Sequence, residues 1–268
     1  MARDFSTSDI ELARRTEAAE AANGFGLARG AEPGLVEVEQ IAGGCAMFAG
    51  AGSPLTHALG IGMNGKLPAG EFDRMEEFFR SRGSASLIDL CPLADMSVVE
   101  EVMKRGYRII EFNNLLLRRA SVEDAGCQAP PDVAISAAGE AAREEWCRLL
   151  VRGFSSTVEI DEAALRLVRG LTGAGTNYLA RLDSAAVATA GMSMHGGVAM
   201  LYGDTTIAAA RGRGVQQALI RHRLAQAARA GCEWAMACVI PGSGSHRNYE
   251  RSGFELFYMR VNVQRDFA

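Results

Sequence analysis

Hydrophobic residues recur along the chain at two kinds of spacing, which predict alternating helices and short strands. Ser8-Asp9-Ile10-Glu11 is typical of a capping box and predicts a helix over residues 8–22. The glycine-rich residues 23–34 predict a connection. The elements predicted next are strands over 35–42, 45–49 and 56–63, a helix over 68–83, a strand over 84–90, a helix over 92–105 and a strand over 107–118.

A segment without periodicity, residues 121–134, separates this part from a second one. It contains Gly126, Pro130 and Pro131 and predicts a linker. The elements predicted after it are helices over 138–151 and 160–171, strands over 178–183, 186–195 and 198–206, a helix from Val215, a strand over 232–239, a short helix over 246–252 and a last strand from 253. Because helices and strands follow the same order in both parts, the sequence predicts an internal repeat of one α/β unit, with domains at 1–120 and 135–268.

The composition is that of a folded protein. Hydrophobic residues make up 48% of the chain and charged residues 22%, which is enough apolar material for a core. The net charge of −4 argues against nucleic acid as a partner. A polar N-terminal segment, and no apolar run of membrane-spanning length, predict a cytoplasmic protein without a membrane partner. The six cysteines lack metal-binding spacing, so we expect reduced core thiols and no structural metal.

One glycine-rich stretch, Arg211-Gly212-Arg213-Gly214, follows the strand predicted at 198–206 and precedes a helix. Glycines adopt positive φ readily and let a ligand approach the backbone. The first turn of a helix has N–H groups without internal partners, and the helix dipole adds positive charge there. We therefore expect a phosphate group, and foremost a diphosphate, to bind here; the alternative is a basic turn that only caps the helix.

Two motifs, in the right order, resemble those of the GNAT superfamily of N-acetyltransferases. Arg211-Gly212-Arg213-Gly214-Val215-Gln216 is similar to the family's acetyl-CoA motif, Gln/Arg-x-x-Gly-x-Gly/Ala, and Tyr249-Glu250-Arg251-Ser252-Gly253-Phe254 to its Tyr-Glu-Lys-x-Gly-Phe. The chain departs from the family at Gln216, where Gly or Ala is usual, and at Gly242, where many members have Asn. The resemblance covers residues 135–268. It implies α/β units with a mixed, mostly antiparallel central sheet flanked by helices.

The resemblance also implies the ligand and its contacts. Acetyl-CoA would be the co-substrate, bound by Thr206, Ile207, Ala208, Arg211, Gly212, Arg213, Gly214, Val215 and Gln216, with Ser245 and Asn248 beside the CoA arm. Tyr249 matches the position of the acid that protonates the leaving thiolate, and backbone N–H groups of residues 206–208 would stabilise the oxyanion.

For the base, the residues leave three alternatives open. Asp204 would serve if burial raised its pKa. His195 titrates near neutral pH. The third alternative is that no protein base is needed. Two other segments have open roles. The run Arg221, His222 and Arg223 predicts a solvated helix face, and the alternative is that it contacts the 3′-phosphate of CoA. The loop at 152–159 offers Phe154 and Glu159 as candidate contacts of the acceptor.

Together these features predict an N-acetyltransferase that moves acetyl from acetyl-CoA to an amine of a small molecule or peptide by direct attack. The first copy lacks the glycine motif and has Val102 where the second has Tyr249, so we expect a degenerate unit that acts as a scaffold. The competing hypothesis is a non-catalytic acyl-CoA-binding regulatory or scaffold protein, which Gln216 and the absence of a marked base favour. The protein is expected to be a monomer or a homodimer.

Overall fold

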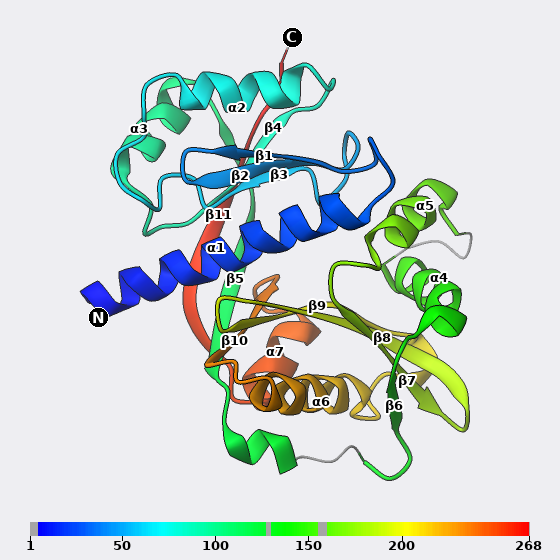
Figure 1. Ribbon diagram of the computed structural model, residues 1–268. Helices are drawn as coiled ribbons and strands as arrows, with labels where there is room; N and C mark the ends of the chain where they lie inside the picture. The colour runs from blue at the N-terminus through cyan, green and yellow to red at the C-terminus, as the bar shows by residue number, and fades with distance from the viewer. Residues whose placement is uncertain (1–4, 127–129, 155–159, 268) are drawn as a thin grey trace. The chain divides into compact units, whose positions relative to one another are not determined.

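The computed structural model describes residues 5–126, 130–154 and 160–267 and divides into two compact units (Figure 1). The first is built from the described parts of Met1–Ala28, Glu32–Leu115 and Tyr258–Ala268, and the second from those of Arg29–Ala31 and Leu116–Phe257. The units are therefore not single segments of chain, in contrast to the contiguous domains predicted at 1–120 and 135–268.

The first unit is a small sheet with helices. Its elements are α1 (Thr7–Gly30), β1 (Glu37–Ile41), β2 (Gly44–Phe48), β3 (His57–Leu59), α2 (Glu71–Arg80), β4 (Ser86–Leu90), α3 (Met96–Lys104) and the start of β5 (Arg108–Arg119). β1, β2 and β3 pair antiparallel, and β3 and β4 pair parallel. The last strand, β11 (Glu255–Arg265), pairs antiparallel with β4 over Val261–Arg265, which places the C-terminal residues in this unit. The stripe Phe72, Met75, Phe78 and Phe79 of α2 is buried in its core, as predicted.

Helix α1 differs from its prediction at both ends. Ser6 and Asp9 cap it by reciprocal hydrogen bonds between side chains and backbone N–H groups, in place of the predicted Ser8–Glu11 box. The helix also continues through residues 23–30, which were predicted as a connection, because this part buries Leu27 on the same face. Burial of one face therefore outweighs the low helix propensity of glycine here.

The second unit has five consecutive strands and four helices of more than one turn among its described residues. Its elements are a 3-10 turn η1 (Val122–Gly126), β6 (Ala134–Ala137), η2 (Glu140–Ala142), α4 (Arg143–Phe154), α5 (Glu162–Leu171), β7 (Thr176–Leu182), β8 (Ala185–His195), β9 (Val198–Thr206), η3 (Ala208–Ala210), α6 (Val215–Arg229), β10 (Trp234–Val239) and α7 (Gly244–Arg251). The strand order is β10-β9-β8-β7-β6, antiparallel except for the parallel pair β9–β10. β6 is a correction: the sequence predicted a linker that ends at residue 134 and a helix from residue 138, with no strand between them, whereas Ala134–Ala137 pair with β7.

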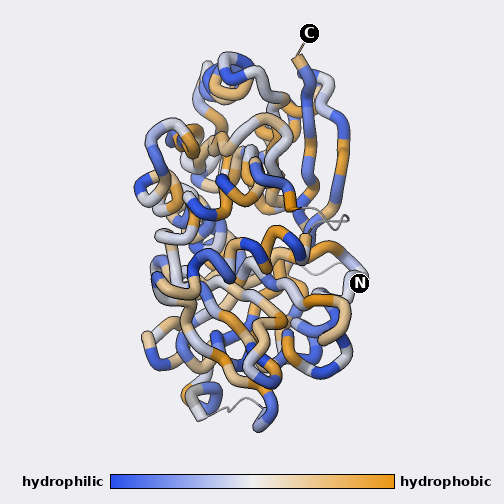
Figure 2. Tube along the Cα trace, turned by 90° about the vertical axis from the view of Figure 1, so that its right-hand side faces the viewer, coloured by the Kyte–Doolittle hydropathy of each residue, from blue (hydrophilic) through white to orange (hydrophobic). Residues whose placement is uncertain are grey.

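Alternate residues of β7 show how helices cover both faces of this sheet. Leu179 packs with Trp146 and Cys147 of α4 and Leu165 of α5. Its neighbours Tyr178 and Ala180 belong to the cluster that contains the apolar residues of α6. Since successive side chains of a strand point to opposite faces, α4 and α5 lie on one face and α6 on the other. Hydrophobic and hydrophilic residues are interleaved along the chain (Figure 2), as expected where one side of each helix is buried.

The parallel pair in the second unit is short. β9 and β10 pair only over Val198–Met200 and Trp234–Met236. Within this unit, the remainder of β9, up to Thr206, pairs only with β8. The carboxyl end of β9 is therefore not closed by its parallel neighbour, and the candidate site residues lie at this end.

Candidate functional site

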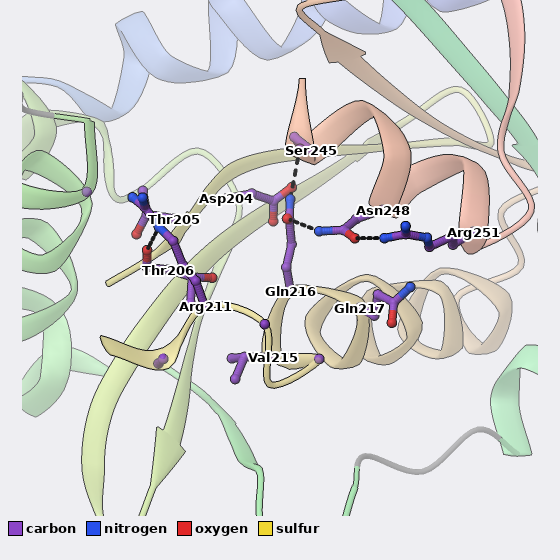
Figure 3. Close-up of a pocket in the computed structure, with 15 residues that line it drawn as sticks. Asp204, Thr205, Thr206, Arg211, Val215, Gln216, Gln217, Ser245, Asn248 and Arg251 are labelled. Carbon is purple, nitrogen blue, oxygen red and sulfur yellow. Dashed lines mark hydrogen bonds between the residues drawn. The ribbon is translucent and has the colours of Figure 1, made fainter. Parts of the chain in front are cut away.

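A pocket of about 540 Å³ lies where β9 ends and α6 and α7 begin (Figure 3). Its volume is within the range of ordinary small-molecule sites. The residues that line it come from the end of α4, the end of β9, the following loop, the first turn of α6 and α7: Gly153, Asp204, Thr205, Thr206, Ala210, Arg211, Gly212, Gly214, Val215, Gln216, Gln217, Gly244, Ser245, Asn248 and Arg251.

The loop that joins β9 to α6 requires its glycines. Gly212 and Gly214 have φ of 77° and 74°, in the left-handed region that other residues adopt at a cost. Gly214 is the N-cap of α6, and no side chain caps that helix. Backbone N–H groups of its first turn, with the positive end of the helix dipole, are therefore directed to the pocket wall that Val215, Gln216 and Gln217 form. The uncapped N-terminus lies where the sequence predicts a phosphate group, and free backbone N–H groups at the start of a helix suit an anion.

Two arginines add positive charge to this pocket. Arg211 lines it and donates from Nε to the carbonyl oxygen of Thr206 at 3.1 Å. Arg251 of α7 lines it as well and donates from Nη1 to Asn248 Oδ1 at 3.3 Å. Arg213, predicted as a ligand contact, is not among the lining residues, and its Nη2 lies 3.5 Å from Asp132 Oδ2.

Gln216 connects the first turn of α6 to α7. Its Nε2 donates to Ser245 Oγ at 2.9 Å, and its Oε1 accepts from Asn248 Nδ2 at 2.8 Å (Figure 3). The resemblance implied that Gln216 is a contact of acetyl-CoA, at a position where Gly or Ala is usual. In the structure it extends across the pocket and connects two of its walls.

A β-bulge positions Asp204. In the β8–β9 pair, Thr189 lies opposite Thr205 and Gly191 opposite Tyr202, so two residues of β9, Gly203 and Asp204, face one residue of β8. Gly203 has φ of 65°, which a bulge of this kind requires of a glycine. The carbonyl oxygens that the bulge leaves outside the ladder accept hydrogen bonds from side chains: Gly203 O from Thr189 Oγ1 at 2.9 Å, and Ala190 O from Trp146 Nε1 at 3.2 Å.

The carboxyl group of Asp204 is nearly buried and hydrogen-bonded from two helices. Its side chain is 9% exposed. Arg223 Nη2 donates to Oδ1 at 2.5 Å, and the Tyr249 hydroxyl donates to Oδ2. Burial raises the pKa of Asp204 above its ordinary value, although the Arg223 charge and the hydrogen bonds from Tyr249, Arg223 and Gln216 offset part of this increase.

Tyr249 lies behind Asp204. It is 1% exposed and is not among the residues that line the pocket. Burial, followed by the negative charge of Asp204, raises its pKa well above the ordinary value for tyrosine. The structure thus brings two of the predicted catalytic residues together as a hydrogen-bonded pair, in which the carboxyl group and not the phenol faces the pocket.

Other predicted residues lie elsewhere. His195 is at the end of β8 opposite Val198, at the far end of β9 from Thr206, and burial lowers its pKa. Ile207 and Ala208 follow β9 but are not lining residues. Arg223 is a correction: the sequence predicted a solvated side chain, and it is fully buried. Phe154 is 71% exposed at the end of α4, and Glu159 lies outside the described residues.

Sequence reasoning missed six lining residues: Gly153, Thr205, Ala210, Gln217, Gly244 and Arg251. Arg251 is part of the quoted tyrosine motif, and Gly244 of a glycine–serine turn, so both carried a signal. Gly153 lies at the end of a predicted helix. A Cβ there would come within 2.4 Å of Thr205 Cβ, and this requirement for glycine is visible only in three dimensions.

Residues 143–254 match the model of the acetyltransferase (GNAT) family. These residues are similar to the domain that the family model describes. No curated protein matches the chain. The family match contains the glycine loop, the bulge, Asp204 and Tyr249, so the candidate site lies entirely within the matched residues.

Solved structures resemble the whole chain in fold. A GCN5-related N-acetyltransferase from Kribbella flavida has a TM-score of 0.69 at 18% identity, with 96% of each chain covered. A tandem GNAT protein from the clavulanic acid biosynthesis pathway has a TM-score of 0.64 at 12% identity, over 97% of this chain and 94% of that one. A GCN5-related N-acetyltransferase from Sphaerobacter thermophilus has a TM-score of 0.58 at 14% identity, with 99% of this chain and 95% of that one covered. The GNAT fold, a mostly antiparallel sheet with flanking helices, is shown by these matches.

Among the described residues, no group of three or more His, Cys, Asp and Glu side chains is arranged to hold a metal ion. Within the same residues, no helix is both long and apolar enough to cross a membrane.

Proposed function

We propose that the GNAT domain transfers an acetyl group from acetyl-CoA to an amine of a small molecule or peptide. One observation carries the proposal: a single pocket joins an uncapped helix N-terminus with two left-handed glycines to a nearly buried carboxyl group. The first feature suits the diphosphate of CoA, and the second suits removal of a proton from an amine.

The ligand contacts follow from the walls of the pocket. The diphosphate would accept hydrogen bonds from the backbone N–H groups around Gly212, Gly214 and Val215, with Arg211 and Arg251 as counter-charges. The pantetheine arm would follow the end of β9, whose residues beyond Met200 have no pair in β10. Ser245 and Asn248 would face that arm from α7.

In the transfer step, an amine must be neutral to attack the thioester carbonyl. Asp204 would take the amine proton, and the raised pKa of its carboxyl group suits it to this role. The carbonyl oxygen becomes negative and needs a fixed N–H donor. Ile207 N–H already donates to Val187 O at 2.9 Å, so within the predicted segment 206–208 only the N–H groups of Thr206 and Ala208 remain as candidate donors.

The leaving thiolate needs a proton, and the reaction moves one proton from nitrogen to sulfur overall. The resemblance implies Tyr249 as the donor. Because its hydroxyl is hydrogen-bonded to Asp204 and buried, we assign the transfer to the Asp204–Tyr249 pair, with protonated Asp204 as the group that faces the sulfur.

The first unit supports the proposal as an inactive repeat. Gly106 and Gly253 have φ of 73° and 82°, and each follows a helix by the same turn: Tyr107 N–H donates to Val102 O, and Phe254 N–H to Tyr249 O. In the first unit, however, the chain fills the space that follows the parallel strands β3 and β4. Asp95 N–H donates to Gly62 O at 3.0 Å, and a Cβ on Gly62 would lie 2.3 Å from Val98 Cγ2.

The alternative function is a non-catalytic acyl-CoA-binding protein, and the burial of Tyr249 away from the pocket favours it. Thiol release from acetyl-CoA, measured with a panel of primary amines, separates the two. An enzyme releases CoA only with an acceptor present, and Asp204→Asn should lower the rate by about 100-fold or more while acetyl-CoA still binds. Binding without release for any amine supports the alternative.

A further inference from the structure

Arg223 is a fully buried arginine whose donors are all used. It lies on α6, outside the two GNAT motifs quoted above, and has 0% exposure. A guanidinium group has five N–H donors in a fixed plane, and five acceptors surround this one. They are Leu219 O (3.2 Å from Nε), Gly191 O and Tyr202 O (3.0 and 3.3 Å from Nη1), and Asp204 Oδ1 and the Tyr249 hydroxyl oxygen (2.5 and 3.5 Å from Nη2).

Apart from Leu219 O, which lies on α6 itself, these acceptors come from both strands of the bulge and from the candidate catalytic pair. Gly191 O and Tyr202 O belong to the residues that face each other where the β8–β9 register shifts. The Tyr202 ring packs on Gly191, where a Cβ would lie 2.3 Å from Tyr202 Cε2. One planar group therefore fixes the bulge backbone and the Asp204 carboxylate relative to each other.

We propose that Arg223 is a positioning residue for acyl transfer: it holds the Asp204 carboxylate, with Tyr249 on its other oxygen, in one orientation at the pocket. The inference rests on the proposed function, because it assigns to Asp204 the role of base. The carboxylate that pairs with this buried charge also lines the ligand pocket, so the ion pair fixes a group that a substrate in the pocket can reach.

Two charged or titratable groups act on Asp204 in the described part of the chain, Arg223 from α6 and Tyr249 from α7, and both lower its pKa. Loss of the Arg223 charge should therefore raise that pKa. The base would then become available only at higher pH, and the acidic limb of the pH–rate profile would move upward.

The test compares Arg223→Gln with Arg221→Gln, since Arg221 is an exposed arginine on the same helix. In full-length, carboxyl-labelled protein, NMR follows the titration of Asp204, assigned with Asp204→Asn. We expect Arg223→Gln to raise the Asp204 titration point by about one pH unit or more. The acidic limb of acetyl transfer should move by the same amount, and Arg221→Gln should change neither. An unchanged titration point or limb in Arg223→Gln would overturn the proposal.

Two further measurements keep the test decisive. Calorimetry with acetyl-CoA should give affinities for Arg223→Gln and wild type that agree within about twofold; if wild type binds no acetyl-CoA, the proposed function fails, and not the role of Arg223 alone. Should Arg223→Gln not fold, Tyr249→Phe removes the other hydrogen bond to Asp204 with little change of shape. It should move the titration point in the same direction, and no movement would contradict the proposed arrangement.

Discussion

Asn248 Nδ2 donates to Gln216 Oε1 at 2.8 Å, and this hydrogen bond connects α7 to the first turn of α6. Gln216 Nε2 in turn donates to Ser245 Oγ. All three residues line the pocket. The glutamine that departs from the family motif thus holds the α6 and α7 walls of the pocket at a fixed separation.

Gln216→Ala should reduce the stability of the protein. It removes two side-chain hydrogen bonds that are partly buried, so we expect the free energy of unfolding in urea to fall by about 1–2 kcal/mol. Gln217→Ala is the matched control, since its side chain makes no hydrogen bond recorded among the described residues and should change stability by less than about 0.5 kcal/mol. Equal effects of the two variants would show that the connection between α6 and α7 contributes nothing.

Tyr249→Phe distinguishes an acid from a positioning group. If the phenol protonates the thiolate directly, kcat falls at every pH. The geometry predicts instead a rate close to that of wild type above the acidic limb, with the limb itself moved to higher pH, because a hydrogen bond that lowers the Asp204 pKa is lost. A pH series of kcat/KM measures this, and a uniform loss of about 100-fold or more would restore the direct acid role.

The order of elements and the glycine loop could be predicted from the sequence, because both depend on local spacing. The buried state of Arg223 could not, since its partner Asp204 is nineteen positions away and comes into reach only through the bulge in β9. The bulge itself had a signal: Gly203 lies inside a predicted strand, where a glycine often marks one. The requirement for glycine at position 153 and the existence of strand β6 could not be predicted, because they depend on the positions of Thr205 and of β7 in three dimensions.

A buried pair in the first unit makes stability depend on pH. His57 Nδ1 lies 3.1 Å from Asp89 Oδ2. Burial alone would lower the pKa of His57, but the charge and hydrogen bond of Asp89 raise it above 6.5; burial would raise the pKa of Asp89, but His57 lowers it below 3.8. The contribution of His57 to the free energy of unfolding is therefore complete below about pH 6.5 and is lost as the pH rises through the raised pKa of His57. The aspartate contribution is lost only in acid, as pH falls through the lowered pKa.

His57→Gln should remove the alkaline loss. We expect wild-type stability in urea, measured at a series of pH values, to fall from about pH 6.5 upward, and the variant to show a smaller slope over the same range. His222 serves as a control, because burial lowers its pKa and His222→Gln should leave the alkaline slope unchanged. Identical slopes for wild type and His57→Gln would show that the pair does not titrate as the geometry predicts.

Calorimetric titration with acetyl-CoA tests the central claim most directly. Gly214→Glu would place a negative side chain where the diphosphate is expected, whereas Gly231→Glu adds the same side chain beyond the other end of α6, at φ of 77° instead of 74°. We predict micromolar binding, about −8 kcal/mol, for wild type and Gly231→Glu and none for Gly214→Glu. Binding that survives Gly214→Glu, or no binding by wild type, would contradict the assignment of the loop as an acetyl-CoA site.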